Sequence, residues 1–152
     1  MNKCCTFFGH RNCPSNIKKV LLNVLLDLVK NKNINCFLVG SEGNFDHFLE
    51  SLKELKILYP NISYSVIKAY LPIKKNTDQP EENYLNTLYP EELSFVPKKY
   101  AIARRNMWML KNSQFVVTYV THESGGGASN FKLIAFKQGK NIIELSDLLL
   151  LD

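Results

Sequence analysis

The sequence lacks the features that would place the chain in a membrane or make it depend on disulfide bonds. No apolar run among its 152 residues reaches the roughly 18 residues of a membrane-spanning helix, and no apolar signal segment opens the chain. Its four cysteines (Cys4, Cys5, Cys13 and Cys36) include no C-x-x-C pair, and with His10 they match no standard zinc spacing. We therefore expect a cytoplasmic protein with reduced thiols, no membrane contact, no metal and no cofactor.

Acidic residues are in the minority. The chain has 19 Lys and Arg residues against 14 Asp and Glu residues, which gives a net charge of +5 and a pI near 9.0. The lysines are scattered along the chain, as on a solvated surface, and do not form the continuous stripe of a nucleic-acid binder. Nucleic-acid binding is therefore possible but not favoured, and the net positive charge also suits a small anionic ligand.

Short apolar strands alternate with amphipathic helices along the chain. Strands are expected at 4–8, 36–39, 62–71, 115–120 and 142–143, and helices at about 15–31, 45–58, 100–111 and 127–137. Ser15 is the expected N-cap of the first helix, and Gly139 and Lys140 are expected to cap the last. This order is typical of βαβ units. It predicts a single Rossmann-like α/β domain over 1–152, with a doubly wound, mainly parallel sheet of about five strands and helices on both faces.

The segment 72–99 interrupts this alternation. It contains four prolines and two Glu-Glu pairs, and it has little hydrophobic periodicity. A structureless loop of this length is unusual inside a compact domain, so the segment is expected to be either a functional lid or a partly ordered insert.

Three expected strands end in glycine-containing or polar turns. In an open parallel sheet, ligands bind beyond the carboxyl ends of the strands, so these turns are expected to share one edge. The run Gly125-Gly126-Gly127 lets the backbone approach an anion and points free N–H groups at it. The same run is also typical of a plain tight turn before a helix. It is neither a G-x-G-x-x-G fingerprint nor a Walker A loop, so classical NAD or ATP binding is not supported. The candidate ligand-binding residues in the turns are Gly9, His10, Arg11, Gly40, Ser41, Gly43, Thr121, His122, Gly125, Gly126, Gly127, Ser129 and Asn130.

Several charged residues lend themselves to more than one role. Arg11 is a candidate to bind a phosphate through both arms of its guanidinium, or a plain surface cation, and His10 is either an acid-base group or a turn residue. Of Arg104 and Arg105 on the third expected helix, we expect one to face solvent and the other to reach the ligand. The carboxylates in the expected site loops are Glu42 and Glu123, each a solvated loop acid or a catalytic acid-base group.

The residues Met107, Trp108 and Leu110 on the same expected helix are read as core side chains, in preference to a platform on which a base would stack.

Several segments in this order resemble the SLOG superfamily, which joins Lonely-Guy-type and DprA-type Rossmann-like proteins, and within it the small bacterial YpsA-like proteins. The segments are 7–11 (FFGHR), 37–46 (FLVGSEGNFD), 104–109 (RRNMWM), 119–122 (YVTH) with the glycine run, and 139–143 (GKNII). The resemblance implies a nucleotide-binding Rossmann-like fold that is often a homodimer, with the ligand at the glycine turns.

Lonely-Guy enzymes cleave the N-glycosidic bond of nucleoside 5′-monophosphates with a P-G-G-x-G-T-x-x-E motif and an arginine on the preceding helix. Arg104 and Arg105 are candidates for that arginine. The glycine run here lacks the leading proline, and 128–132 supplies no glutamate. The missing proline and glutamate belong to the motif with which Lonely-Guy enzymes cleave this bond.

Three functions therefore compete. The first is a binding or sensing domain for a nucleotide or nucleotide-derived phosphate ligand. The second is a hydrolase of a nucleotide glycosidic or phosphate bond, with Glu42 or Glu123 as acid-base group and Arg11 or Arg105 holding phosphate. The third is single-stranded nucleic-acid binding. The first is favoured.

Overall fold

The computed structural model shows one sheet of six parallel strands in the order β4-β3-β2-β1-β5-β6. The structure describes residues 3–10, 14–41, 46–70, 86–121 and 127–149. The strands are β1 (Cys4–Gly9), β2 (Cys36–Gly40), β3 (Ser63–Ile67), β4 (Thr87–Leu88), β5 (Phe115–Tyr119) and β6 (Asn141–Glu144). The helices are α1 (Ile17–Asn31), α2 (Asp46–Leu58), α3 (Ala101–Lys111), α4 (Gly127–Lys137) and α5 (Leu145–Leu149), with 3-10 turns η2 (Glu91–Phe95) and η3 (Lys98–Tyr100).

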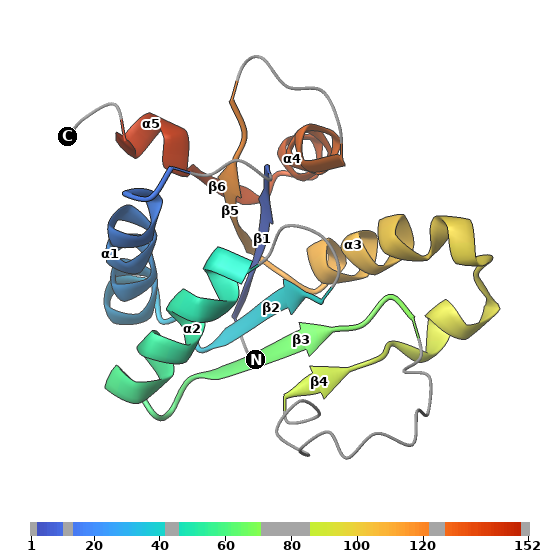
Figure 1. The fold of residues 1–152 in the computed structure, drawn as a ribbon, viewed down its shortest axis with the longest axis horizontal. Helices are drawn as coiled ribbons and strands as arrows, with labels where there is room; N and C mark the ends of the chain where they lie inside the picture. The colour runs from blue at the N-terminus through green and yellow to red at the C-terminus, as the bar shows by residue number, and fades with distance from the viewer. Residues whose placement is uncertain (1–2, 11–13, 42–45, 71–85, 122–126, 150–152) are drawn as a thin grey trace.

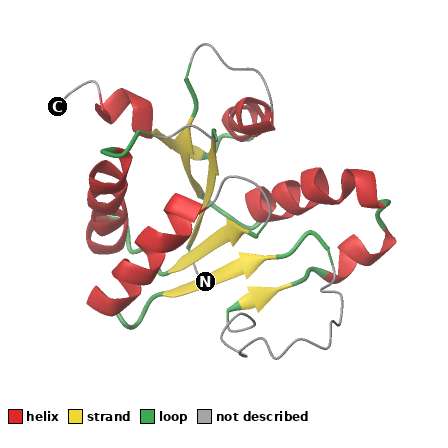
Figure 2. Cartoon of the chain, in the orientation of Figure 1, coloured by secondary structure: helices red, strands yellow, loops and turns green. Residues whose placement is uncertain are grey.

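Helices cover both faces of the sheet. α1 packs beside α2 and α5 on one face, while α3 packs beside α4 on the other (Figures 1 and 2). Strand order runs outward from β1 in one direction through β2 and β3, and in the other through β5 and β6. Right-handed crossovers in opposite directions place their helices on opposite faces. The predicted Rossmann-like, doubly wound α/β fold is confirmed.

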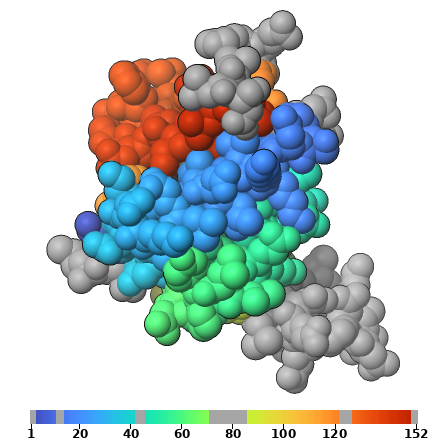
Figure 3. Space-filling view, turned by 90° about the vertical axis from the view of Figure 1, so that its left-hand side faces the viewer, coloured from blue at the N-terminus to red at the C-terminus, as the bar shows by residue number. Residues whose placement is uncertain are grey.

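The apolar spacing in the sequence explains how the layers meet. Six buried residues of α1 recur at helical spacing and face the sheet: Ile17, Val20, Leu21, Val24, Leu25 and Leu28. Successive side chains of β1 point to opposite faces, so Phe7 stacks on Phe48 of α2 at 4.9 Å between ring centroids, while Phe8 stacks on Phe131 of α4 at 5.2 Å. Viewed from the α1 side, α1 and α2 form a continuous surface over the sheet (Figure 3).

Glycine and asparagine end two of the helices in left-handed backbone. Asn33 follows α1 with φ of 57°, and Gly139 follows α4 with φ of 73°. Next to Gly139, the backbone N–H of Lys140 donates to the carbonyl of Ala135 at 3.0 Å. The predicted end of α4 is therefore confirmed.

The sheet of about five strands that the sequence predicts has six in the structure, because β4 adds a short strand at its edge. Its two residues pair with Val66 and Ile67 of β3. Two residues are too few to show a hydrophobic period, so the sequence does not indicate this edge strand. The described part of the predicted insert, 86–99, also forms η2 and η3, and Leu93 of η2 is buried. The rest of that insert lies outside the described residues.

Two element boundaries also differ from expectation. β3 covers five residues and not the ten predicted from its β-branched composition. The cap of α1 is Asn16, not Ser15, and its side chain makes no capping hydrogen bond. Among the described residues, no helix is long and apolar enough to cross a membrane.

Candidate functional site

The ends of four parallel strands bring the described first residues of the predicted turns to one edge of the sheet. Gly9 at the end of β1 pairs with Tyr119 at the end of β5, and the backbone N–H of His10 donates to the Tyr119 carbonyl at 3.0 Å. At the next pair of strands, the N–H of Ser41 donates to the carbonyl of Ile67 at 3.2 Å. We define the carboxyl edge as the residues Gly9, His10, Gly40, Ser41, Tyr119 and Thr121.

The direction in which successive strands are added to the sheet reverses at β1, since β2 lies on one side of it and β5 on the other. Ligands of open α/β sheets bind at such a switch point, beyond the strand ends. In this chain the switch point falls between β1 and β5, which end at Gly9 and Tyr119. His10 and Thr121, described residues that follow these strands, therefore flank the position where a ligand is expected.

Gly9 occupies a position with little room for a side chain. A Cβ added there would lie 3.1 Å and 3.2 Å from two carbons of the Phe48 ring, closer than ordinary van der Waals contact. That ring is itself buried and stacked on Phe7. Glycine therefore lets α2 pack closely against the end of β1.

Two helices begin beside the switch point without an acidic residue in their first turn. α1 follows β1 and α4 follows β5, and neither carries Asp or Glu there, whereas α2 begins with Asp46. The first N–H groups of a helix have no partner within it, and the helix dipole makes that end positive. The amino ends of α1 and α4 thus keep a positive potential that no first-turn carboxylate offsets.

The two adjacent arginines of α3 lie in different environments. Arg105 is fully buried, whereas Arg104 is exposed on the outer face of the helix. The Nε of Arg105 donates to the side-chain oxygen of Asn106 at 2.9 Å, and its Nη1 donates to the carbonyl of Ile67 at 3.3 Å. Because Ser41 donates to the same carbonyl, the buried guanidinium lies against the carboxyl edge.

Sequence reasoning missed Glu144, the buried carboxylate that ends β6. It accepts hydrogen bonds from the Thr118 hydroxyl at 2.7 Å, the Val120 N–H at 3.0 Å, the Lys132 ammonium at 2.7 Å and the Ser146 hydroxyl at 2.7 Å. Burial alone would raise the pKa of Glu144, but the hydrogen bonds from Lys132, Thr118 and Ser146 outweigh it and hold the pKa below its usual range.

This carboxylate therefore stays ionised at neutral pH, and it fixes the backbone just before Thr121 at the carboxyl edge. A glutamate closing an apolar strand, in the run 142–145, was the available signal for it.

The other predicted residues fall into three groups. Gly127 and Asn130 are exposed in the first turn of α4, and Ser129 is half-buried there. Leu110 is buried and Trp108 packs on the core, as expected. The prediction that Met107 is a core residue is wrong, since 36% of it is exposed on the outer face of α3. The remaining candidates lie outside the described residues: Arg11, Glu42, Gly43, His122, Glu123, Gly125 and Gly126.

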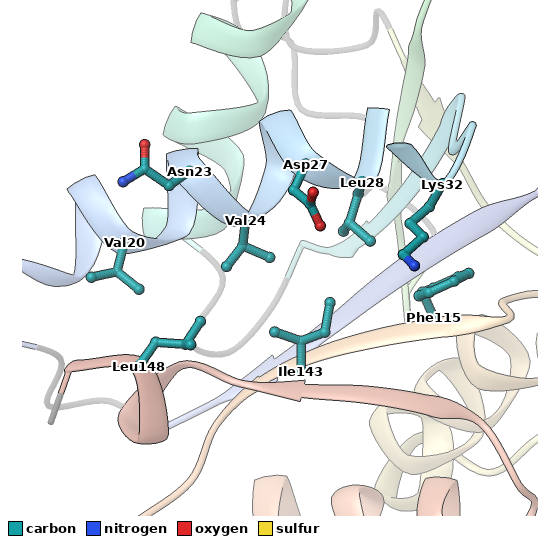
Figure 4. Close-up of a pocket in the computed structure, with 9 residues that line it drawn as sticks. All are labelled: Val20, Asn23, Val24, Asp27, Leu28, Lys32, Phe115, Ile143 and Leu148. Atoms are coloured by element: carbon teal, nitrogen blue, oxygen red, sulfur yellow. The ribbon is translucent and has the colours of Figure 1, made fainter. Parts of the chain in front are cut away.

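A cavity of about 590 Å³ lies elsewhere, between α1 and the β6–α5 segment (Figure 4). In Figure 4, Val24 and Leu28 of α1 face Ile143 of β6 across it, with Asp27 and Lys32 along the α1 side. Among the residues that the structure describes, no predicted site residue lines it. It is an apolar groove bearing one charge of each sign, which gives it no preference for an anion.

Within the described ranges, no three His, Cys, Asp or Glu side chains gather in a group that could hold a metal ion. Comparison of the sequence with models of protein families and with curated proteins gives no match.

Proposed function

We propose that the carboxyl edge binds a nucleotide-type phosphate ligand, and that the chain serves as a binding or sensing domain for it. One observation carries the proposal: at the switch point between β1 and β5, the amino ends of α1 and α4 both lack an acidic first-turn residue. A phosphate accepts hydrogen bonds from unpaired helix N–H groups, and its charge is stabilised by the positive ends of the helix dipoles.

The buried guanidinium of Arg105 supports the same proposal. It lies at the ends of β2 and β3, on the same edge as Gly40 and Ser41, and adds a permanent positive charge there. A low-dielectric setting strengthens its attraction for an anion relative to that of an exposed cation. In this proposal the helix ends hold the phosphate, and Arg105 raises the potential of the whole edge.

Glu144 is unsuited to act as a general acid at this edge. A general acid needs a raised pKa, whereas the pKa of Glu144 is lowered and its oxygens already accept hydrogen bonds from four residues. Its arrangement suits positioning of the β5 end. The predicted catalytic residues Glu42 and Glu123 lie outside the described residues, and hydrolysis stays an untested prediction.

The test is thermal unfolding of the protein against a panel of ligands: AMP, other nucleoside monophosphates, ADP-ribose, NAD, cyclic nucleotides, inorganic phosphate and a short single-stranded DNA. A ligand at a hundred times its dissociation constant adds about 2.7 kcal/mol, which raises the midpoint by several degrees. We expect a shift with one nucleotide, recovered unchanged by chromatography. Cleavage of that nucleotide would favour the hydrolase, and no shift with any small molecule would overturn the proposal.

The resemblance noted above also implies a homodimer, and we propose the outer face of α4 as its contact surface. Leu133 and Phe136 are 52% and 73% exposed there, next to the edge strand β6. Aromatic and aliphatic side chains exposed together are typical of interfaces. Sedimentation analysis should show a dimer for the protein and a monomer for Phe136→Glu; a monomer in both cases would contradict this surface.

The proposed location is the cytoplasm. The thiols of Cys4, Cys5 and Cys36 are free, which fits a reducing compartment.

A further inference from the structure

A hollow of about 390 Å³ lies on the outer side of α3, between η2 and the turn that joins α4 to β6. Its volume is within the range of small-molecule sites. Arg104 and Lys111 reach it from α3, and Lys140 reaches it from the turn. Glu92 of η2 is the carboxylate among its described lining residues, so positive charge predominates.

Three cations surround this hollow, and the described residues offer their side chains no partner. Within the described part of the chain, none of Arg104, Lys111 and Lys140 donates a side-chain hydrogen bond or forms an ion pair. Other lysines do find carboxylates: Lys18 lies 3.2 Å from Glu54, for example. Like charges that converge on one hollow add their potentials, so an anion placed there offsets their mutual repulsion.

Trp108 gives the hollow a flat apolar wall. It is half-buried, packs on the hydrophobic core and also lines the hollow, together with the exposed Met107. Because Trp108 packs on the core as well as lining the hollow, its indole is held in place where a planar ring can stack on it. We propose that this hollow binds a small organic phosphate that carries a planar ring, with the phosphate on the cations and the ring on Trp108.

This site is separate from the carboxyl edge. Arg104 and Arg105 are neighbours in the sequence, but Arg105 is buried against Ile67 while Arg104 lines the hollow. No residue of the carboxyl edge is among the described residues that line the hollow. Because the two sites share no described residue, substitutions in the hollow test this proposal separately from the proposed function.

Trp108 is also the only tryptophan in the chain, so its fluorescence reports on this site alone. The probe is phenyl phosphate, titrated at low ionic strength with excitation at the indole. We expect saturable quenching in the wild-type protein and a dissociation constant at least tenfold weaker in the double variant Arg104→Gln, Lys111→Gln. The control is Lys137→Gln, which removes an exposed lysine of α4 that does not line the hollow and should leave the dissociation constant unchanged.

A second variant separates loss of charge from loss of structure. Arg104→Lys combined with Lys111→Arg keeps both charges and should retain binding within about threefold, and circular dichroism should match across all variants. Absence of saturable quenching, or equal affinities in the wild-type and double-Gln proteins, would overturn the proposal. Tighter binding of a short oligonucleotide than of phenyl phosphate, with a steep dependence on salt, would overturn it in favour of nucleic acid.

Discussion

The buried guanidinium of Arg105 donates a hydrogen bond to the carbonyl of Ile67 at the last residue of β3. The same carbonyl accepts the N–H of Ser41, so one backbone oxygen joins β3, the end of β2 and a side chain of α3. Arg105 therefore holds the second α-helical layer against the edge where a ligand is proposed to bind. Its role in stability and its role in binding have to be measured separately.

Replacing Arg105 by alanine should destabilise the fold. The change empties one of the largest fully buried side-chain positions and removes donors from Ile67 and Asn106, so we expect a loss of about 3 kcal/mol in the free energy of unfolding. Urea unfolding measures it. The matched control is Arg104→Ala, on the exposed face, which should change the free energy by less than about 0.5 kcal/mol. Equal effects at the two positions would contradict the buried arrangement.

Adding a methyl group at Gly9 should force the Phe48 ring to move. That ring is stacked on Phe7 and has little freedom, so Gly9→Ala should cost about 1–2 kcal/mol of stability. The double variant with Phe48→Leu removes the clash, and there the cost of Gly9→Ala should fall to near zero. A thermodynamic cycle of the four proteins gives the coupling. Additive effects would show that the two residues do not touch.

Removing the charge of Glu144 should cost stability in a pH-dependent way. Because the folded-state pKa is lowered, its stabilising contribution is complete above the unfolded-state pKa and is lost as pH falls through the folded-state pKa. Glu144→Gln should therefore be less stable than wild type by about 3 kcal/mol at pH 7, since it leaves the Lys132 ammonium without its partner. Chemical unfolding from pH 7 to pH 3 should show this difference shrinking with acid. A difference that is constant or grows with acid would be inconsistent with the lowered pKa.

The thiols inside the sheet should resist alkylation. Burial raises the pKa of Cys4 to about 12, with a further rise from the neighbouring Cys36 thiol, and burial also raises the pKa of Cys5. Since the thiolate is the reactive form, iodoacetamide at pH 8 should leave both unmodified in the folded protein and modify both in urea. Peptide mass spectrometry reads each site. Equal rates with and without urea at Cys5 would mean that β1 is not buried as described.

The strength of each sequence signal explains how well each part of the fold could be predicted. The alternation of apolar strands and amphipathic helices predicts the doubly wound fold, because the spacing of apolar residues repeats over many positions, as in α1. β4 has two residues and no period, and β3 ends before its β-branched composition does. The shared edge of the described strand ends followed from topology, since parallel strands have their carboxyl ends on one side of the sheet.

The site itself was only partly predictable. Glycine turns at strand ends are a local pattern, and Gly9 and Ser41 lie where that pattern indicated. Glu144 depends on partners 12 to 26 residues away, Lys132 and Thr118, which no local pattern links to it. The choice between Arg104 and Arg105 was likewise open, because neighbouring positions on a helix differ in burial only once the helix has packed.

The most direct test of the central claim places a carboxylate at the amino end of α4. A Cβ at Gly127 would meet nothing within 4 Å, so Gly127→Glu fits, and an acid in a first helical turn stabilises the helix. Isothermal titration with the nucleotide selected by the panel compares it with Gly127→Gln. The proposal predicts equal or greater thermal stability for the Glu variant, with binding at least tenfold weaker than in the Gln variant, because the carboxylate repels the phosphate. Equal affinities in the two variants would contradict phosphate binding at the carboxyl edge.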